Sequence, residues 1–237
     1  MRLDEKDLTM ETIKAYDTLA KCYRRKPWRI ISLVENHIPD DDIYIADIGC
    51  GKGQYIKYFL SKRKRIRIIA IDLSQVMVQE MYREIDQKHR VLPIVADAIQ
   101  LPIMDNKVYA SLYIAVIHHI LSRNYRYQAL KEAYRVLVNK GLILVTVWAL
   151  KQLAFIPFII KYYFKKILKI LKIIKKAEKI YSKGKTYRRH YYLFTLNELI
   201  NEIKSVGFII EKKGIFYPSK KLLKPTKNYY VLARKPQ

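Results

Sequence analysis

The sequence predicts an α/β fold in which a mainly parallel sheet carries helices on both faces. Short apolar runs alternate with segments that have apolar residues at helical spacing, which is typical of βαβ units. A glycine-rich loop follows the first run, and a capped helix and two strand-like segments end the chain. With 237 residues, 51% of them hydrophobic, the chain suits one well-buried domain, expected to span residues 1–237.

Five apolar runs are expected to form the parallel strands. They are Ile43–Ile48, Ile66–Ile71, Val91–Val95, Ser111–Ile117 and Gly141–Ala149. Between them, apolar residues recur at helical spacing in Tyr55–Arg63, Ser74–His89 and Arg126–Leu137. Strands and helices therefore alternate, and this order predicts parallel pairing.

The C-terminal third is expected to add a helix and an antiparallel pair of strands. Thr195 and Glu198 have the spacing of a capping box, and Gly207 is placed to end the helix that follows. Two strand-like segments, Phe208–Lys212 and Tyr229–Arg234, come after it. A parallel core finished by an antiparallel pair is a specific arrangement.

The region from about 151 to 187 is expected to be a basic helical insertion. Lysines recur every three or four residues between Ile160 and Ile180, opposite an apolar face, which predicts an amphipathic helix. A solvated lid, a grip on nucleic-acid phosphates and a helix in a membrane interface all stay open. No membrane span is expected, because no run of about 20 apolar residues occurs.

The net charge predicts a polyanionic partner. The chain has 46 Lys and Arg against 21 Asp and Glu, a formal charge of +25. Solubility alone does not need this excess, and acids are too scarce for the ion-pair networks of a thermophile surface. Nucleic acid is expected first and an anionic membrane second. Two cysteines and an N-terminus without an apolar signal core favour a cytoplasmic location.

The glycine-rich loop IADIGCGKGQY follows the first run. Asp47 ends the strand, and Gly49, Gly51 and Gly53 allow positive φ angles and let a ligand lie against the backbone. The third glycine comes two positions after the second rather than three, which points away from a dinucleotide.

Two further aspartates end the next two runs. Asp72 is placed to hold ribose hydroxyls, and Asp97 to accept from an adenine amino group. One such acid would often only cap a turn. Three at successive strand ends beside a glycine loop predict a site for a cofactor that contains a nucleoside.

Two adjacent histidines, His118 and His119, close the fourth run. A strand sends successive side chains to opposite sides, so at most one of them is expected to touch a substrate. A buried, satisfied histidine is the alternative for either. No metal site is expected, because the two rings diverge and no nearby cysteine or acid completes a ligand set.

The glycine loop and strand-end acids resemble those of class I S-adenosylmethionine-dependent methyltransferases, whose seven-stranded Rossmann-like sheet ends in an antiparallel hairpin. Four stretches, AYDTLAKCYRRKPW, YIAVIHHILSRNYR, VTVWALKQ and RRHYYLFTLNEL, are similar to the tRNA wobble-uridine carboxymethyl methyltransferases. That family converts 5-carboxymethyluridine into its methyl ester. The resemblance implies methyl transfer from S-adenosylmethionine to a tRNA carboxylate, with S-adenosylhomocysteine as product.

The resemblance also assigns roles to residues of this sequence. His118, His119 and Arg126 match the segment that faces the modified base. Substrate contact is therefore expected mainly from His119, which would donate a hydrogen bond, and from Arg126, which would grip the carboxylate as a fork. His118 is expected to make a structural or cofactor-side contact. The carboxylate is ionised at pH 7, so no general base is expected. Residues implied to bind the cofactor are Tyr16, Arg24, Asp47, Gly49, Cys50, Gly51, Gly53, Asp72, Leu73, Asp97, Ala98 and Ile114. Lys52 departs from the family pattern, in which an uncharged residue is common there.

Family members generally work with a small zinc-binding activator protein, so the resemblance implies a heterodimer in which the partner holds the zinc. The apolar stretch RVLPIV would suit edge-on strand addition. Two other functions stay open: a methyltransferase for a small lipid or quinone at a membrane surface, and a silent subunit that only binds RNA. The four stretches weigh against the first, and the intact loop and acids against the second.

Overall fold

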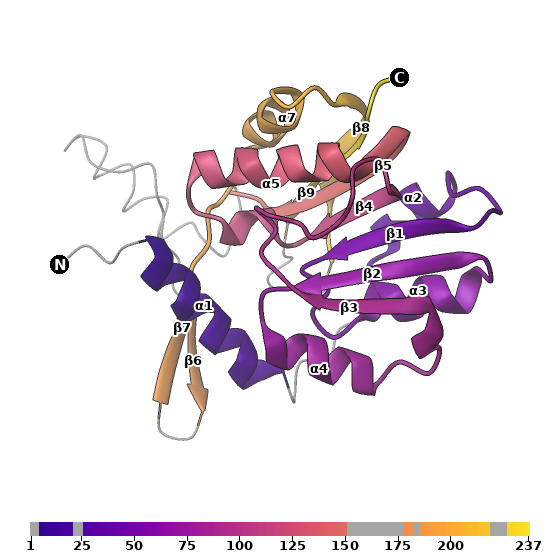
Figure 1. Ribbon diagram of the computed structural model, residues 1–237. Helices are drawn as coiled ribbons and strands as arrows, with labels where there is room; N and C mark the ends of the chain where they lie inside the picture. The colour runs from indigo at the N-terminus through magenta and orange to yellow at the C-terminus, as the bar shows by residue number, and fades with distance from the viewer. Residues whose placement is uncertain (1–4, 21–25, 151–177, 183–184, 219–226) are drawn as a thin grey trace.

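Residues 5–20, 26–150, 178–182, 185–218 and 227–237 are described by a computed structural model of the chain. The strands of its main sheet are β1 (Ile43–Ile48), β2 (Ile66–Asp72), β3 (Val91–Val95), β4 (Val108–Ile114), β5 (Leu137–Trp148), β8 (Ile209–Phe216) and β9 (Asn228–Arg234). This sheet has seven strands in the order β3-β2-β1-β4-β5-β9-β8 (Figure 1). The first five strands pair in parallel, and β9 is antiparallel to both β5 and β8. The predicted sheet is confirmed.

Helices cover both faces of the sheet, as predicted. One face packs against α2 (Ser32–Glu35), α3 (Gln54–Lys62) and α4 (Gln75–Arg83), and the other against α5 (Arg123–Val136) and α7 (Leu196–Lys204). Two hydrophobic clusters result, one on each side of the sheet. Because both faces are covered, the central strands are apolar almost throughout instead of alternating with polar residues.

The C-terminal elements follow the predicted local signals. The Thr195 side chain accepts from the Glu198 N–H, and the Glu198 side chain accepts from the Thr195 N–H, which confirms the capping box at the start of α7. Gly207 has a φ of 107° and follows the end of this helix. Both predicted strands form, and β8 runs on to Phe216 because it pairs along the whole of β9.

The predicted fourth strand and second helix differ from the structure at their ends. β4 runs from Val108 to Ile114 rather than from 111 to 117, because Ala115 takes a left-handed φ of 63° and turns the chain out of the sheet. The helix predicted over 74–89 ends at Arg83, and a separate 3-10 turn covers Lys88–Arg90. Apolar spacing alone did not show either break.

The predicted basic insertion lies mostly outside the described residues, since residues 151–177 are not among them. Its end is a second, two-stranded sheet of β6 (Glu178–Ser182) and β7 (Lys185–Arg189), so the predicted helix does not reach Ile180. This hairpin stands beside α1 (Glu5–Leu19) (Figure 1). None of the described helices has both the length and the apolar content of a membrane span.

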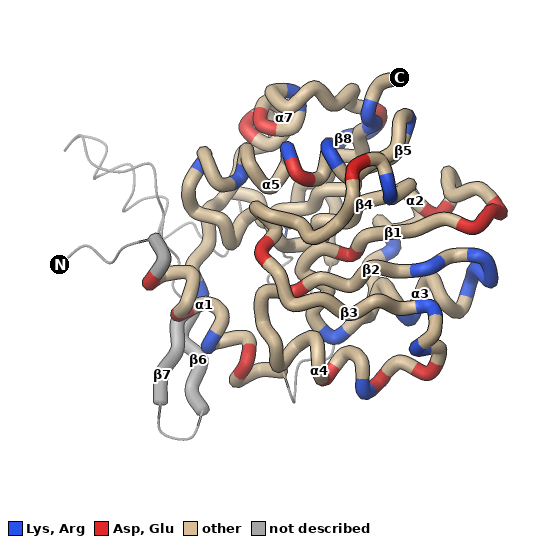
Figure 2. The backbone as a smooth tube through the Cα atoms, viewed as in Figure 1, with Lys and Arg blue, Asp and Glu red and all other residues tan. Residues whose placement is uncertain are grey.

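Lys and Arg residues are spread over many described elements rather than gathered on one helix (Figure 2). One group, residues 62–67, lies where α3 leads into β2. Arg65 in this group is ion-paired with Asp41 at 3.3 Å and Asp42 at 3.5 Å. The group lies at the amino-terminal end of β2, and its charge is partly neutralised.

Candidate active site

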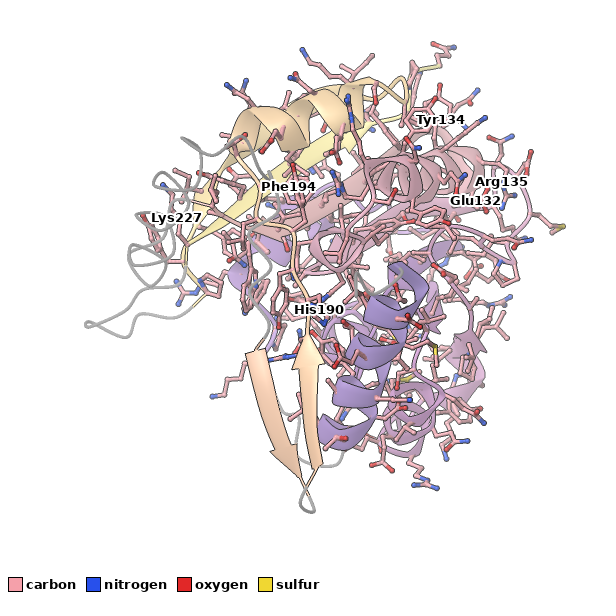
Figure 3. All side chains as sticks on the ribbon, turned by 90° about the vertical axis from the view of Figure 1, so that its left-hand side faces the viewer. Glu132, Tyr134, Arg135, His190, Phe194 and Lys227 are labelled. Carbon is pink, nitrogen blue, oxygen red and sulfur yellow. The ribbon has the colours of Figure 1, made fainter. Side chains whose placement is uncertain are left out.

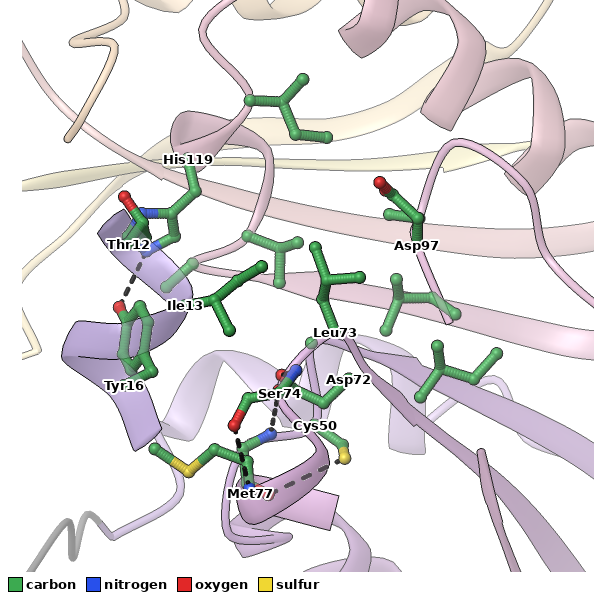
Figure 4. Close-up of a pocket in the computed structure, with 18 of the residues that line it drawn as sticks. Thr12, Ile13, Tyr16, Cys50, Asp72, Leu73, Ser74, Met77, Asp97 and His119 are labelled. Atoms are coloured by element: carbon green, nitrogen blue, oxygen red, sulfur yellow. Dashed lines mark hydrogen bonds between the residues drawn. The ribbon is translucent and has the colours of Figure 1, made fainter. Parts of the chain in front are cut away.

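A cavity of about 510 Å³ lies at the carboxyl ends of β1, β2, β4 and β5 (Figure 4). A ligand site is expected there, because the connections leave β1 and β4 in opposite directions and open a crevice between them. Neighbouring strands lie about 4.8 Å apart, so three intervals from β2 to β5 span roughly 15 Å. This length suits an extended ligand with a nucleoside at one end.

The glycine-rich loop forms one wall of the cavity. Gly49 and Gly51 have φ angles of 67° and 52°. A Cβ on Gly49 would lie 2.5 Å from Val116, whereas one on Gly51 would meet no atom within 4 Å. Gly49 therefore permits close backbone packing, and Gly51 leaves open space beside the cavity. Gly53 begins α3 and does not line the cavity, contrary to its predicted role.

Asp72 holds the glycine loop and lines the cavity. Its Oδ2 accepts a hydrogen bond from the Gly51 N–H at 2.9 Å, and its Oδ1 accepts one from the Ser74 N–H at 2.9 Å. Burial raises the pKa of Asp72, while these N–H donors act to lower it. The carboxylate is thus fixed at the cavity wall, where its remaining acceptor positions can receive hydroxyl groups.

Asp47 is not among the residues that line the cavity, and its predicted contact with the cofactor stays a prediction. Its side chain is buried, and its Oδ2 has no hydrogen-bond partner among the described residues. Burial and the charge of Asp72 raise the pKa of Asp47 to about 8. Because N–H groups bond to Asp72, that residue keeps the charge of the pair and Asp47 holds a proton at neutral pH.

Asp47→Asn should stabilise the ligand-free protein, increasingly so as the pH rises. A carboxyl with a raised folded pKa contributes its full stability below its unfolded pKa, and this is lost as the pH rises toward about 8. The asparagine variant keeps this stability, whereas the wild type loses up to about 1.4 kcal/mol of unfolding free energy per pH unit. Urea unfolding at pH 5 and pH 8 measures the difference, with exposed Asp86→Asn as control. Equal effects at both pH values would contradict the buried proton.

Most of the other predicted cofactor residues do line the cavity. They are Tyr16, Gly49, Cys50, Gly51, Asp72, Leu73, Asp97, Ala98 and Ile114. Asp97 also accepts from the Ile99 N–H through its Oδ1 at 3.1 Å, so part of its carboxylate caps the turn after β3. Arg24 lies outside the described residues.

The histidine pair lies in a 3-10 turn, Ile117–His119, and both histidines line the cavity. The predicted divergence of the two side chains was therefore wrong. It assumed a strand, whereas successive residues of a 3-10 turn are about 120° apart and can share one side. The ring centroids of His118 and His119 are 4.6 Å apart.

Both ring nitrogens of His119 are engaged. The Tyr16 hydroxyl lies 2.8 Å from Nε2 (Figure 4). The His190 carbonyl lies 3.3 Å from Nδ1. A carbonyl oxygen only accepts, so in the neutral ring Nδ1 carries the proton and Nε2 accepts from Tyr16. The predicted hydrogen bond from His119 to a substrate would have to displace one of these partners.

The helix α1 forms another wall of the cavity and is fixed from two sides. Glu11 lies 2.7 Å from His190 Nε2, where the chain leaves β7 and passes α1 (Figure 3). The Ser74 hydroxyl donates to Asp17, which joins α1 to the loop after β2. Tyr16 on the same helix reaches the histidine turn. The helix therefore links the Asp72 end of the cavity to the histidine end.

Arg126 is a structural residue, which corrects its predicted role. Its side chain is 2% exposed and does not line the cavity. Its Nε and Nη2 donate to Glu202 at 2.9 and 2.7 Å, and its Nη1 donates to the carbonyls of Ile120 and Leu121 at 3.1 and 2.8 Å. The guanidinium is therefore occupied, and it fixes the segment that follows the histidine turn.

An aromatic cluster beside the histidine turn was not assigned to the site from the sequence. Trp148 lines the cavity, stacks on Tyr191 at 4.4 Å and lies 5.5 Å from the His118 ring. The guanidinium of Arg189 lies 5.3 Å from the Tyr16 ring and 5.8 Å from the Tyr191 ring. The signal was present, because these residues fall in VTVWALKQ and RRHYYLFTLNEL. No hydrophobic periodicity or residue spacing in the sequence, however, indicates that the two stretches lie side by side in the fold.

Lys52, the residue of the glycine loop that departs from the family pattern, is turned toward α4. Its Nζ lies 2.6 Å from Glu84 and 3.9 Å from Glu80, and Lys57 also pairs with Glu84. Hydrogen bonds from the two lysines lower the pKa of Glu84 to about 2. The extra positive charge is therefore neutralised within the protein. Among the described residues, no group of three His, Cys, Asp or Glu could hold a metal ion.

Comparison with known proteins agrees with this fold and cavity. A family model described as a methyltransferase domain matches residues 46–145. The tRNA (carboxymethyluridine(34)-5-O)-methyltransferase of Schizosaccharomyces pombe is 27% identical over 225 residues, which cover 85% of this chain and 90% of that protein. The mouse protein of the same description, ALKBH8, is 35% identical over 130 residues, 54% of this chain but only 18% of its own length.

Solved structures share the fold at lower identity. A methyltransferase from Methanosarcina mazei has a TM-score of 0.67 and 18% identity, covering 90% of this chain and 99% of that one. A Haloferax volcanii methyltransferase in complex with the activator Trm112 has a TM-score of 0.67 and 13% identity, covering 96% and 97%.

The strand order, the cavity at the switch point and the matched domain define a class I methyltransferase fold. The chain shares this fold with S-adenosylmethionine-dependent methyltransferases, matches a methyltransferase-domain model over residues 46–145, and is similar to the tRNA carboxymethyluridine methyltransferases.

Proposed function

We propose that this protein transfers a methyl group from S-adenosylmethionine to the carboxylate of 5-carboxymethyluridine at the wobble position of tRNA, giving the methyl ester. The observation that carries the proposal is the similarity to the Schizosaccharomyces pombe enzyme, which extends over 90% of that protein. The cavity supports it, because the cavity runs from the acid that ends β2 to the histidines after β4. The charge of +25 suits a nucleic-acid partner.

The residues at the β2 end of the cavity fit S-adenosylmethionine. Asp72 would receive the ribose hydroxyls, and Asp97 and Ala98 would lie beside the adenine. The open space at Gly51 leaves room for the methionyl part against the backbone. When bound, the cofactor supplies an electrophilic methyl group on a positively charged sulfur.

The substrate would enter at the histidine end. Its carboxylate is ionised at neutral pH, so the protein has to orient it rather than remove a proton. The uracil ring would lie against Trp148 and His118, whose rings border the cavity. His119, held by Tyr16 and His190, would set the width of this end.

Arg189 is the cation that we assign to the substrate carboxylate in place of Arg126. It ends β7, and its guanidinium faces the rings of Tyr16 and Tyr191, the two rings that also flank His119. A planar guanidinium binds a carboxylate through two parallel hydrogen bonds. Arg189 is 7% exposed and is not among the residues that line the cavity, so this assignment requires its guanidinium to turn toward the cavity, past the rings of Tyr16 and Tyr191, when the substrate binds.

Nucleoside analysis tests the proposed function. The protein, S-adenosylmethionine and tRNA carrying 5-carboxymethyluridine are incubated with and without an activator of the Trm112 type, and the digested tRNA is examined by mass spectrometry. We expect the methyl ester of 5-carboxymethyluridine. An unmodified tRNA in both mixtures would overturn the proposal.

The lipid or quinone alternative receives no support from the described residues. It depends on the basic segment around 151–181, of which residues 151–177 are outside them. The relatives from Schizosaccharomyces pombe and Arabidopsis thaliana, which match 85% and 59% of this chain, are described as tRNA (carboxymethyluridine(34)-5-O)-methyltransferases.

The β3 edge is proposed to bind the activator. β3 is an outer strand of the sheet, it contains Pro93, and the side chains of Leu92 and Val95 are 54% and 49% exposed. Proline is tolerated on edge strands, and an exposed apolar edge is open to strand addition. The solved complex of the Haloferax volcanii neighbour with Trm112 supports a partner of this kind.

The chain expressed alone should be poorly soluble or inactive, and the activator should correct this. Leu92→Lys combined with Val95→Lys should abolish co-purification with the activator, because charges on the exposed edge oppose strand pairing. Met104→Lys, at an exposed apolar residue outside β3, is the matched control. A fully active, soluble chain without any partner would contradict the prediction.

A further inference from the structure

Tyr125 stands at the mouth of the cavity in a setting that the methyl transfer itself does not explain. It lies in the first turn of α5, lines the cavity and is 37% exposed. No described residue makes a ring contact or hydrogen bond with it. A large ring that borders a cavity without a partner has a face available for a planar ligand.

The position of Tyr125 relative to the histidines indicates which planar ligand its ring would contact. His119, Ile120 and Leu121 line the cavity and are only partly exposed, whereas Tyr125, which follows them in the first turn of α5, lines the cavity at an exposed position. His118 is 1% exposed, so a base that reaches it must leave the stack of its loop. The neighbouring base in the RNA then loses a stacking partner and remains outside the cavity.

We infer that Tyr125 stacks on the nucleobase adjacent to the target uridine in the tRNA anticodon loop. This inference rests on the proposed function and adds a contact for a neighbouring nucleotide. Aromatic side chains stack on unpaired bases without regard to sequence, and this is a main mode of single-stranded RNA recognition. Arg123 and Asn124, both exposed, precede Tyr125 and present a positive and polar surface to the backbone of the same loop.

The helix provides a matched control. Tyr127 is on the same helix, two residues further on, and is 43% exposed, but it does not line the cavity. Tyr127→Ala therefore removes an equally large exposed ring from the same element. Tyr125→Phe keeps the ring of Tyr125 and removes only its hydroxyl.

The test uses an anticodon stem-loop with 5-carboxymethyluridine at the wobble position and 2-aminopurine beside it, bound to the protein with its activator. Stacking quenches 2-aminopurine fluorescence. The wild type, Tyr125→Phe and Tyr127→Ala should quench it, whereas Tyr125→Ala should not and should raise KM for the stem-loop roughly tenfold, the size of one base–aromatic stack. Binding of S-adenosylmethionine should be the same in all four proteins.

The outcomes separate this inference from the proposed function. A wild type that makes no methyl ester on tRNA overturns both. A wild type that is active, with Tyr125→Ala equal to Tyr127→Ala in quenching and KM, overturns only the stacking contact. Weaker S-adenosylmethionine binding by Tyr125→Ala at unchanged quenching would assign Tyr125 to the cofactor and likewise overturn it.

Discussion

Arg126→Ala should strongly destabilise the protein, and the loss of methyl transfer should follow from the loss of folded protein. The substitution leaves the Glu202 carboxylate buried without its partner, and breaking a buried ion pair in this way costs about 3–5 kcal/mol. The carbonyls of Ile120 and Leu121 lose their donor as well. Since folded domains are stable by only about 5–15 kcal/mol, we expect a large fall in Tm.

A double variant tests whether the ion pair is the cause. Arg126→Met with Glu202→Leu replaces the pair by apolar side chains and should recover most of the lost stability, because no charge remains buried alone. Thermal unfolding followed by circular dichroism compares the three proteins. If Arg126→Ala keeps the wild-type Tm and loses only transfer, Arg126 contacts the substrate after all.

Arg189→Ala should remove the preference for a charged substrate. A hydrogen bond to a charged group contributes about 1.5–3 kcal/mol, so kcat/KM for tRNA with 5-carboxymethyluridine should fall roughly 10- to 150-fold. S-adenosylmethionine affinity should stay unchanged, because Arg189 lies beside the rings of Tyr16 and Tyr191 and is not among the residues that line the cavity. Arg189→Lys should recover only part of the loss, since an ammonium group lacks the planar fork.

A neutral competitor makes this prediction specific to charge. RNA with 5-carbamoylmethyluridine has nearly the same shape but no negative charge. The wild type should bind the acid more tightly than the amide, and Arg189→Ala should bind both equally. An unchanged preference in the variant would show that another group holds the carboxylate.

The parts of the fold that follow from local signals were predictable from the sequence. Continuous apolar runs, the glycine loop and the capping box at Thr195 each specify their element through neighbouring residues, so the sheet and α7 are close to expectation. The break after β4 was not predictable, because an alanine at 115 gives no sign of a left-handed φ. The left-handed residue ends β4, and the 3-10 turn that carries both histidines follows it.

The errors in the candidate site have a common physical origin. The pairing of Arg126 with Glu202 joins residues 76 positions apart, and no local pattern shows that a guanidinium is already occupied. The position of Arg189 beside Tyr16 likewise depends on how β7 packs against α1. The acids and glycines at the strand ends, in contrast, are brought together by parallel strand order alone, and Asp72 and Gly51 do meet.

The most direct test of the central claim is the alkali lability of the transferred methyl group. Radiolabelled methyl from S-adenosylmethionine is incorporated into tRNA by the protein and its activator, and the tRNA is then treated with mild base. A methyl ester on a carboxylate oxygen predicts that nearly all of the label leaves as methanol. Label that stays with the nucleosides would place the methyl on a base or a ribose and contradict this account.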